Sequence, residues 1–379
     1  MRLNRLFMSE GQAGIDHFAA LADTYGKEGF AVESQVRYHP RPEQEGDLAA
    51  WEQYVRSATE ALAGNPALVA LTITNEVNLP VSENTSDGAY EGALDAIVTG
   101  TVAAQDVLVA MGREDVDLGF SYAYRYLPDQ DLAFWQGIGH RATPEFHAAL
   151  DYVGVQLYPG LFWPPVFAPG QTAGNATIEA LTLVRDCYMP QAGIGANVEI
   201  WVTENGYATN LGRRLERQVN DLTSTIEDVC AYSGTLNVPD YRYFNLRDNR
   251  SDGGDLFDAV GLLFDDYAEK PAFSAYRDMI ETCGQAEPGA GGGLQLRLRV
   301  RCRGDDDARA RLKGRDVDVV QGVVFRSRGG RIAADRRPPF ARTLPEDEFG
   351  AARRWRVTAR VQLEGGQRDK LRRTKRPCD

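Results

Sequence analysis

Two segments, LTITNEVN at residues 71–78 and EIWVTENG at residues 199–206, share one pattern. In each of them an apolar, β-branched run ends at a glutamate, Glu76 or Glu204, which polar or turn-forming residues follow. Such runs are typical of strands that are buried on both faces of a parallel sheet. A carboxylate at the end of a buried strand is costly for stability unless it has partners or a chemical role. The pattern therefore predicts a pair of chemically active carboxylates at one edge of a sheet.

Strand-like and helix-like patterns alternate on both sides of these segments, which is typical of a parallel sheet with helical crossovers. An eight-stranded barrel and an open doubly wound sheet both fit this alternation. No GxGxxG or P-loop pattern follows a strand, so the barrel is favoured. The predicted strands cover residues 30–38, 67–74, 116–124, 152–158, 198–203 and 241–246. The predicted helices cover residues 15–26, 47–63, 87–111, 176–189, 214–233 and 272–282.

The number of predicted strands is smaller than a closed barrel requires. Six strands are predicted, whereas a TIM (β/α)8 barrel has eight, and the chain opens on a helical pattern. We therefore expect an α/β fold built as a TIM barrel that lacks its first two strands. A genuinely smaller sheet is the alternative. We also expect that a signal peptide was lost with those strands and that the protein is extracellular.

The charge distribution divides the chain into two parts. From Leu294 onward there are 24 Lys and Arg against 12 Asp and Glu, although the whole chain has a net charge of −12. A Gly-rich run at 288–293 precedes this change and is typical of a flexible linker. We therefore expect a barrel domain at 1–283, a linker at 284–293 and a basic domain at 294–379.

The basic domain has a pattern of its own. Period-two alternation at 294–302, 317–325 and 355–363 predicts a small antiparallel β-sandwich with Arg on its wet face. We expect that this face is simply solvated. Contact with an anionic polymer or a cell surface is the alternative.

Composition limits the other classes of function. No run reaches the roughly 18 apolar residues that a membrane span needs. An acidic main body does not attract nucleic acid. The five cysteines form no CxxC or His/Cys cluster, so we expect no metal and no cofactor. Cys302 and Cys378 either pair or stay as thiols. We expect a monomer.

Paired carboxylates at the ends of barrel strands indicate glycoside hydrolysis. Active sites of parallel α/β barrels lie at the carboxyl ends of the strands, where Glu76 and Glu204 are predicted. This reaction needs one protonated carboxyl group for the leaving oxygen and one ionised carboxylate for the anomeric carbon or a water molecule. A Ser-His-Asp hydrolase is disfavoured, because the chain has only four His and no GxSxG segment.

These residues also carry a family resemblance. Asn75-Glu76 and the segment WVTENG resemble the acid/base and nucleophile strands of clan A glycoside hydrolases, which include the family 5 cellulases and mannanases. YVGVQLYPG at residues 152–160 resembles the sixth barrel strand, YHP at 38–40 the end of the third, and YRYFNLRD at 241–248 the eighth. The resemblance covers about residues 15–282.

The resemblance implies a retaining mechanism and a set of roles. Glu76 would be the acid/base, Glu204 the nucleophile, and the two carboxyl groups would lie about 5–5.5 Å apart. Asn75 would bond the sugar 2-hydroxyl, and Tyr158 would contact Glu204. Both endo and exo action on oligo- or polysaccharides fit this picture. The further predicted substrate-binding residues are His39, Trp163, Tyr243 and Asn245.

The sequence also departs from the family pattern. Gln156 stands where the family often has histidine, Tyr243 is the nearest candidate for a usual tryptophan, and the arginine of the second strand has no counterpart in the predicted strands. A non-catalytic carbohydrate-binding or cell-surface protein with a degenerate barrel is therefore the alternative to an enzyme.

Overall fold

The computed structural model describes residues 1–81, 83, 85–283, 296–303, 307–314, 320–327, 330–335, 340–344, 355–363 and 368–375. The chain forms two compact units, which are described separately. One unit contains residues 1–105 and 117–287, and the other contains residues 106–116 and 288–379. The expected linker, at 284–293, lies outside the described residues.

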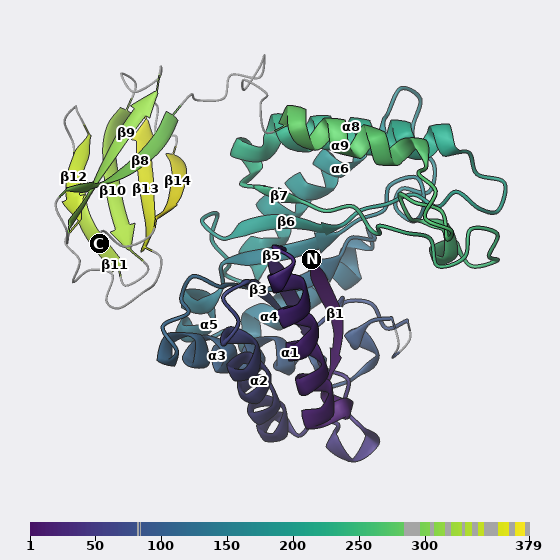
Figure 1. Cartoon of the computed structure of the whole chain (residues 1–379), viewed down its shortest axis with the longest axis horizontal. Helices are drawn as coiled ribbons and strands as arrows, with labels where there is room; N and C mark the ends of the chain where they lie inside the picture. Colours follow the sequence, from purple (N-terminus) through teal and green to yellow (C-terminus); the bar gives the residue numbers. More distant parts are fainter. Residues whose placement is uncertain are drawn as a thin grey trace. The chain divides into compact units, whose positions relative to one another are not determined.

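The first unit is built on a seven-stranded parallel sheet whose strands follow one another in sequence order. Each strand pairs in parallel with the next, so every connection is a crossover that returns the chain to the same end of the sheet. The sheet forms part of a TIM barrel, with helices outside it (Figure 1). The strands are β1 (Arg2–Phe7), β2 (Val32–Arg37), β3 (Leu68–Ile73), β4 (Asp117–Ala123), β5 (Tyr152–Gln156), β6 (Glu199–Glu204) and β7 (Asp240–Tyr241).

The partial barrel is confirmed, but the predicted count of six strands is wrong. Residues 2–7 form β1. Polar residues separate its two buried ones, Leu3 and Leu6, so the strand signal in the sequence was weak. The described residues thus contain seven parallel strands, one fewer than a closed barrel, rather than two fewer as expected. The strand predicted at 241–246 is reduced to two residues, β7.

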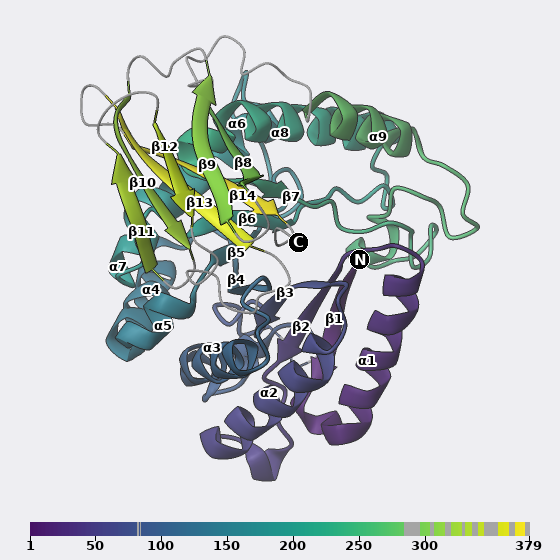
Figure 2. The same ribbon diagram turned by 60° about the vertical axis from the view of Figure 1, so that its left-hand side comes forward.

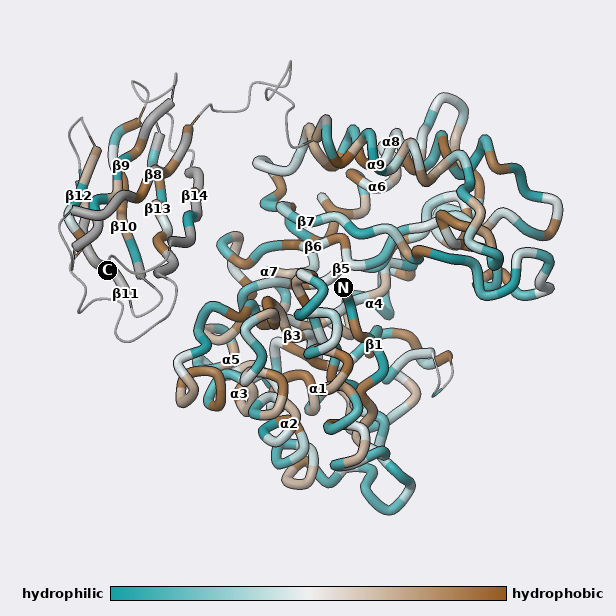
Figure 3. Tube along the Cα trace, in the orientation of Figure 1, coloured by the Kyte–Doolittle hydropathy of each residue, from teal (hydrophilic) through white to brown (hydrophobic). Residues whose placement is uncertain are grey.

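Helices cover the sheet, and their apolar stripes face it. In Figure 3, α8 and α9 alternate between hydrophilic and hydrophobic along their length. Two helices between β4 and β5, namely α4 and α5, were missed from the sequence. The helices are α1 (Gly11–Lys27), α2 (Leu48–Ala63), α3 (Ala93–Ala110), α4 (Pro128–Arg141), α5 (Pro144–Ala149), α6 (Ala173–Leu183), α7 (Met189–Gln191), α8 (Leu215–Leu236) and α9 (Pro271–Cys283). Short turns are η1 (Met8–Glu10), η2 (Pro42–Gln44), η3 (Asp87–Ala89), η5 (Leu256–Ala259) and the π-helical η4 (Val184–Tyr188).

A disulfide and one long apolar helix bear on the environment of the protein. Cys230 of α8 and Cys283 of α9 form a disulfide, with a Cα–Cα distance of 6.0 Å. Cys187 is free and exposed. The side chains of Cys302 and Cys378 lie outside the described residues. In the part of the chain that the structure describes, α3 alone is long and apolar enough to cross a membrane, and half of it is buried inside the protein, as in a core helix.

The second unit contains two antiparallel sheets that share one apolar core, as expected for a small β-sandwich (Figure 2). Arg309 and Arg311 are exposed, whereas Ala310 and Leu312 between and beside them are buried, so this strand has arginine on its wet face. The strand orders are β11-β10-β13-β14 and β12-β9-β8. The strands are β8 (Leu296–Arg303), β9 (Asp307–Gly314), β10 (Val320–Ser327), β11 (Gly330–Asp335), β12 (Ala341–Leu344), β13 (Trp355–Leu363) and β14 (Arg368–Lys375).

A buried ion pair fixes the long loop that follows β7. Lys270 Nζ donates to Asp248 Oδ1 at 2.7 Å and to Thr209 Oγ1 at 2.8 Å, and neither charged side chain is exposed. Asp248 Oδ1 also accepts from the backbone N–H of Gly261. The loops after β6 and β7 are therefore held together from inside at the carboxyl end of the sheet.

We expect the Lys270→Met variant to lose about 3–5 kcal/mol of unfolding free energy, because it leaves the Asp248 carboxylate buried and unpaired. Urea unfolding with the disulfide intact measures this loss. The matched control is Lys27→Met, which removes an exposed pair with Asp23 and should leave the midpoint unchanged. Equal midpoints for the two variants would contradict the bracing role of Lys270.

Candidate active site

The first predicted catalytic residue, Glu76, lies on a tight turn directly after β3. Thr74 and Glu76 have left-handed φ angles of 65° and 47°, which non-glycine residues adopt at a cost. The backbone N–H of Glu76 donates to Ser121 Oγ of β4 at 3.1 Å. At the end of β4, the Asn78 side chain donates to the carbonyl oxygen of Ala123 and accepts from its backbone N–H. The neighbouring strand thus supports this strained turn.

A buried carboxylate, Asp87, holds the same turn from the other side. Asp87 Oδ2 accepts from the backbone N–H groups of Tyr38 and Asn75, at 3.0 and 2.9 Å, and the Asp87 N–H donates back to the Asn75 carbonyl oxygen. Its other oxygen accepts from Arg37 at 2.8 Å. Asp87 is fully buried, and Arg37 nearly so. This ion pair fixes the backbone position from which Glu76 projects.

The second predicted catalytic residue, Glu204, is the last residue of β6 and is surrounded by donors. Tyr158 Oη donates to its Oε2 at 2.7 Å, which confirms the predicted contact. Gln156 Nε2 and Arg2 Nη1 donate to its Oε1 at 3.0 and 3.2 Å. These donors stabilise the negative charge of the carboxylate. Arg2 is the first residue of β1, so its guanidinium reaches Glu204 from the start of a strand, whereas the family arginine was expected at the end of one.

A polar cluster inside the sheet anchors Arg2. The Glu33 carboxylate pairs with Arg2 at 3.4 Å and with Arg242, and it accepts from Thr72 Oγ1 at 2.8 Å. Tyr152, which bonds the same threonine hydroxyl, stacks on Trp201 with centroids 3.8 Å apart. The charges beneath the site are therefore mutually paired.

Burial and charge keep Glu76 protonated near neutral pH. Its exposed fraction is 9%, and burial is the main reason that its pKa rises from the usual 4.5 to about 8. The negative charge of Glu204 raises it further, whereas Arg37 and Arg2 oppose the shift. The site therefore combines a protonated Glu76 with a Glu204 held by three donors, which is the asymmetry that acid/base chemistry requires.

This raised pKa predicts that Glu76 weakens the fold as the pH rises. Its stabilising contribution is complete below about pH 4.5 and is lost as the pH rises through about 8, because the folded state binds the proton more tightly. We expect Glu76→Gln to gain on the order of 4 kcal/mol at pH 8 relative to wild type and little at pH 4. Thermal unfolding at several pH values measures the difference, with the exposed Glu60→Gln as control. A pH-independent difference would contradict the raised pKa.

The predicted substrate-binding residues do not all lie at the same place. Asn75 and Tyr158 contact the two glutamates, at 3.5 and 2.7 Å. His39 Nδ1 lies 3.1 Å from Ser9 Oγ, and its ring packs against Phe7 and Tyr90. Trp163 lies in the loop after β5 and is 37% exposed.

The two predicted substrate-binding residues that follow β7, Tyr243 and Asn245, have different surroundings. The Tyr243 hydroxyl accepts from the Tyr207 N–H, and its ring packs with Tyr276 in the cluster beneath α8 and α9. The rings that pack against Tyr158 include that of Phe244 but not that of Tyr243. Asn245 is half-buried, and its Oδ1 has no hydrogen-bond partner among the described residues.

Sequence reasoning missed several residues that shape the site, and β2 contained their signal. In the segment VESQVR, Glu33, Gln35 and Arg37 alternate with Ser34 and Val36, and all of them are buried. Alternation places the three polar side chains on one face. They reach the Arg2 cluster, Asn75 and Asp87, respectively. Polar residues at every second position of a buried strand, as in β2, therefore indicate side chains that support the site.

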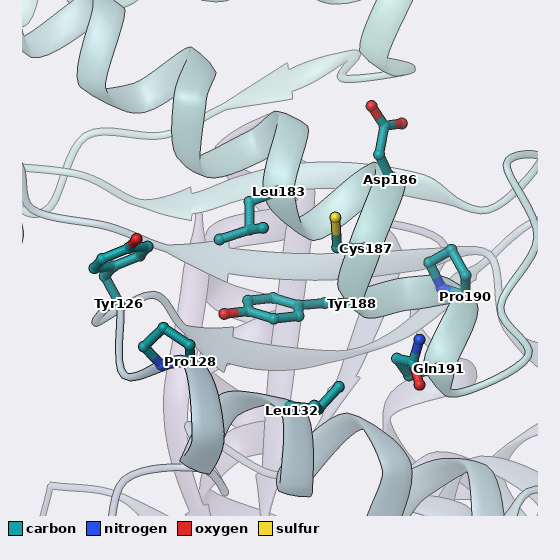
Figure 4. Close-up of a pocket in the computed structure, with 9 residues that line it drawn as sticks. All are labelled: Tyr126, Pro128, Leu132, Leu183, Asp186, Cys187, Tyr188, Pro190 and Gln191. Carbon is teal, nitrogen blue, oxygen red and sulfur yellow. The ribbon is translucent and has the colours of Figure 1, made fainter.

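A surface cavity of about 500 Å³ lies elsewhere, between α4 and the η4–α7 segment (Figure 4). Tyr188 lies at its centre, with Tyr126 and Pro128 on one side and Pro190 and Gln191 on the other. None of its lining residues belongs to the Glu76–Glu204 site. Among the described residues, no group of three or more His, Cys, Asp and Glu side chains is placed to hold a metal.

Comparison with known proteins supports the fold. No protein-family model and no curated protein sequence matches this chain. A GH5_18 variant from Streptomyces cattleya, in complex with Manb1-4GlcNAc, is 17% identical with a TM-score of 0.55, over 78% of this chain and 73% of that one. A GH5_18 variant from Bifidobacterium longum, in complex with the same sugar, is 16% identical with a TM-score of 0.53, over 78% and 71%. The chain therefore has a fold similar to that of clan A glycoside hydrolases.

Proposed function

We propose that this protein hydrolyses β-O-glycosidic bonds in oligo- or polysaccharides with retention of configuration. The observation that carries the proposal is the combination of a buried, protonated Glu76 with a Glu204 held by Tyr158, Gln156 and Arg2. Solvated or structural carboxylates do not need this combination. A fold similar to that of glycoside hydrolases adds support.

The residues divide the reaction into two displacements. In the first, a Glu204 oxygen bonds to the anomeric carbon, the glycosidic C–O bond breaks, and Glu76 transfers its proton to the leaving oxygen. In the second, Glu76 takes a proton from water, the water oxygen bonds to the anomeric carbon, and the ester bond to Glu204 breaks. Asn75 would hydrogen-bond the sugar 2-hydroxyl in both transition states. A carboxyl separation of about 5–5.5 Å is part of this proposal.

We propose an extracellular location for the protein. The Cys230–Cys283 disulfide supports it, because such bonds persist in oxidising compartments. Carbohydrate is the proposed partner, and we propose that the chain acts as a monomer.

Stereochemistry tests the mechanism directly. Purified protein is incubated with 4-nitrophenyl β-glucoside, β-mannoside, β-galactoside and N-acetyl-β-glucosaminide, and with Manβ1-4GlcNAc, while NMR follows the anomeric protons. We expect the β-anomer of the released sugar to appear first with at least one substrate. An α-anomer appearing first would indicate inversion and overturn the retaining mechanism. Saturable sugar binding, with a turnover no faster than that of Glu204→Gln, would favour the non-catalytic alternative.

A further inference from the structure

Two side-chain amides, of Gln156 and Asn75, connect the two glutamates, and a third amide, of Gln35, holds Asn75. Gln35 Nε2, from β2, and Gln156 Nε2, from β5, each donate to Asn75 Oδ1 at 3.0 Å. The same Gln156 nitrogen also donates to Glu204 Oε1 at 3.0 Å. Asn75 Nδ2 in turn lies 3.5 Å from Glu76 Oε2. Contacts therefore run without interruption from one carboxyl group to the other.

The chemistry of these partners fixes the orientation of each amide. Gln156 Nε2 faces two oxygen acceptors, so a flipped side chain would place its oxygen against a carboxylate and an amide oxygen. Gln35 Nε2 also donates to the Thr74 carbonyl oxygen at 2.9 Å, which excludes its flip on the same ground. Asn75 Oδ1 accepts hydrogen bonds from both glutamine side chains, and Asn75 Nδ2 donates to the Thr85 carbonyl oxygen at 2.9 Å. Asn75 is therefore held with its nitrogen toward Glu76.

These amides are deeply buried, which makes their orientation consequential. Gln35 and Gln156 are each 1% exposed, and Asn75 is 6% exposed. Losing one of these buried hydrogen bonds costs about 0.5–1.5 kcal/mol. An amide also has no proton to gain or lose in the working range of pH, so these connections do not change as the carboxyl groups titrate.

We propose that Gln35 and Gln156 are positioning residues, which lock the Asn75 amide toward Glu76 and hold Glu204 in the orientation from which it reacts. The inference rests on the proposed function, because it assigns the two glutamines a part in that reaction. They act through Asn75 and Glu204, and Gln156 is the residue that joins the acid/base turn to the nucleophile strand.

Gln156→Glu is the decisive variant, because it keeps the shape of the side chain and replaces the amide that donates to Asn75 and Glu204 with a carboxyl group. A third carboxyl group within hydrogen-bond distance of Glu204 must share a proton with it, so the pair gives up its last proton at a higher pH than a lone carboxyl group would. We expect the acid limb of the pH profile of kcat/KM to move upward by about one pH unit. The matched control is Gln171→Glu, in which a half-buried glutamine away from the site, which donates to Glu179 at 2.8 Å, receives the same change and should leave the profile unmoved.

Gln35→Leu and Gln156→Leu test the positioning of Asn75. Both should lower kcat by about 10-fold or more with KM changed less. Gln35→Leu should also leave the acid limb in place, because it adds no charge and removes no donor to Glu204. Their melting temperatures separate lost folding from lost positioning. An unmoved acid limb in Gln156→Glu, or wild-type kcat in both leucine variants, would overturn the proposal.

A second measurement keeps this inference distinct from the proposed function. Carbon-13 NMR of the labelled glutamate carboxyl groups follows the titration of Glu204 without any substrate. If wild type hydrolyses no glycoside but the Glu204 titration moves in Gln156→Glu, the proposed function fails and the contact with Glu204 stands. If wild type is active and the titration does not move, the positioning role of Gln156 fails.

Discussion

Glu204→Gln should lose turnover by a factor on the order of 10⁶, which is the scale seen when a covalent nucleophile is removed from an enzyme. The amide keeps the size of the side chain and can still hydrogen-bond to the Tyr158 hydroxyl and to Gln156. It cannot form the ester with the anomeric carbon, so both displacements are lost. Initial rates with the best 4-nitrophenyl glycoside measure this effect.

The exposed Glu216→Gln on α8 is the matched control and should turn over like wild type. A 2-deoxy-2-fluoro glycoside with a good leaving group adds a direct readout. It should label wild type at the peptide that contains Glu204 and should not label the glutamine variant. Label on any other residue, or a Glu204→Gln rate within 10-fold of wild type, would refute the assignment of the nucleophile.

Glu76→Ala should lose about 10²–10⁴-fold in kcat/KM on a substrate whose leaving group is a sugar, because that oxygen needs a proton as its bond breaks. On a 2,4-dinitrophenyl glycoside the loss should be much smaller, since this leaving group departs without a proton. In wild type, kcat/KM for the sugar substrate should fall as the pH rises through about 8, where Glu76 loses its proton. In Glu76→Ala this basic limb should disappear.

Azide separates the acid/base role from a purely structural one. A small anion that needs no general base should restore turnover of the 2,4-dinitrophenyl glycoside by Glu76→Ala and release a β-glycosyl azide. Glu60→Gln, on the exposed face of α2, serves as the control and should keep both the rate and the basic limb. Equal losses on both substrates, or a basic limb that survives in Glu76→Ala, would exclude Glu76 as the acid.

Much of the fold could be predicted because buried parallel strands have an unambiguous sequence pattern. Segments 68–73 and 200–202 are apolar runs, and both lie in strands of the structure, β3 and β6. β1 was missed, because Arg2, Asn4 and Arg5 interrupt its apolar residues. Its polar residues are explained only by tertiary contacts, since Arg2 lies between the carboxylates of Glu33 and Glu204. A local pattern cannot reveal a partner that is 202 residues away.

The site was predicted unevenly for the same reason. The Tyr158–Glu204 contact follows from the ends of two strands that prove to be adjacent in the sheet. Asp87 was expected to begin a long helix, but it lies in η3 and holds the Asn75–Glu76 turn. Nothing in its immediate sequence distinguishes it from a surface aspartate. Its role depends on Arg37, which lies 50 positions away.

The sequence by itself determined which side chains stand at the carboxyl ends of the strands, because strand periodicity and strand ends are local properties of the chain. It thereby selected Glu76 and Glu204. Only the tertiary structure decided that one of them holds a proton and the other is surrounded by donors. That difference arises from burial and from charges on other strands, and both exist only after the sheet has brought distant segments together.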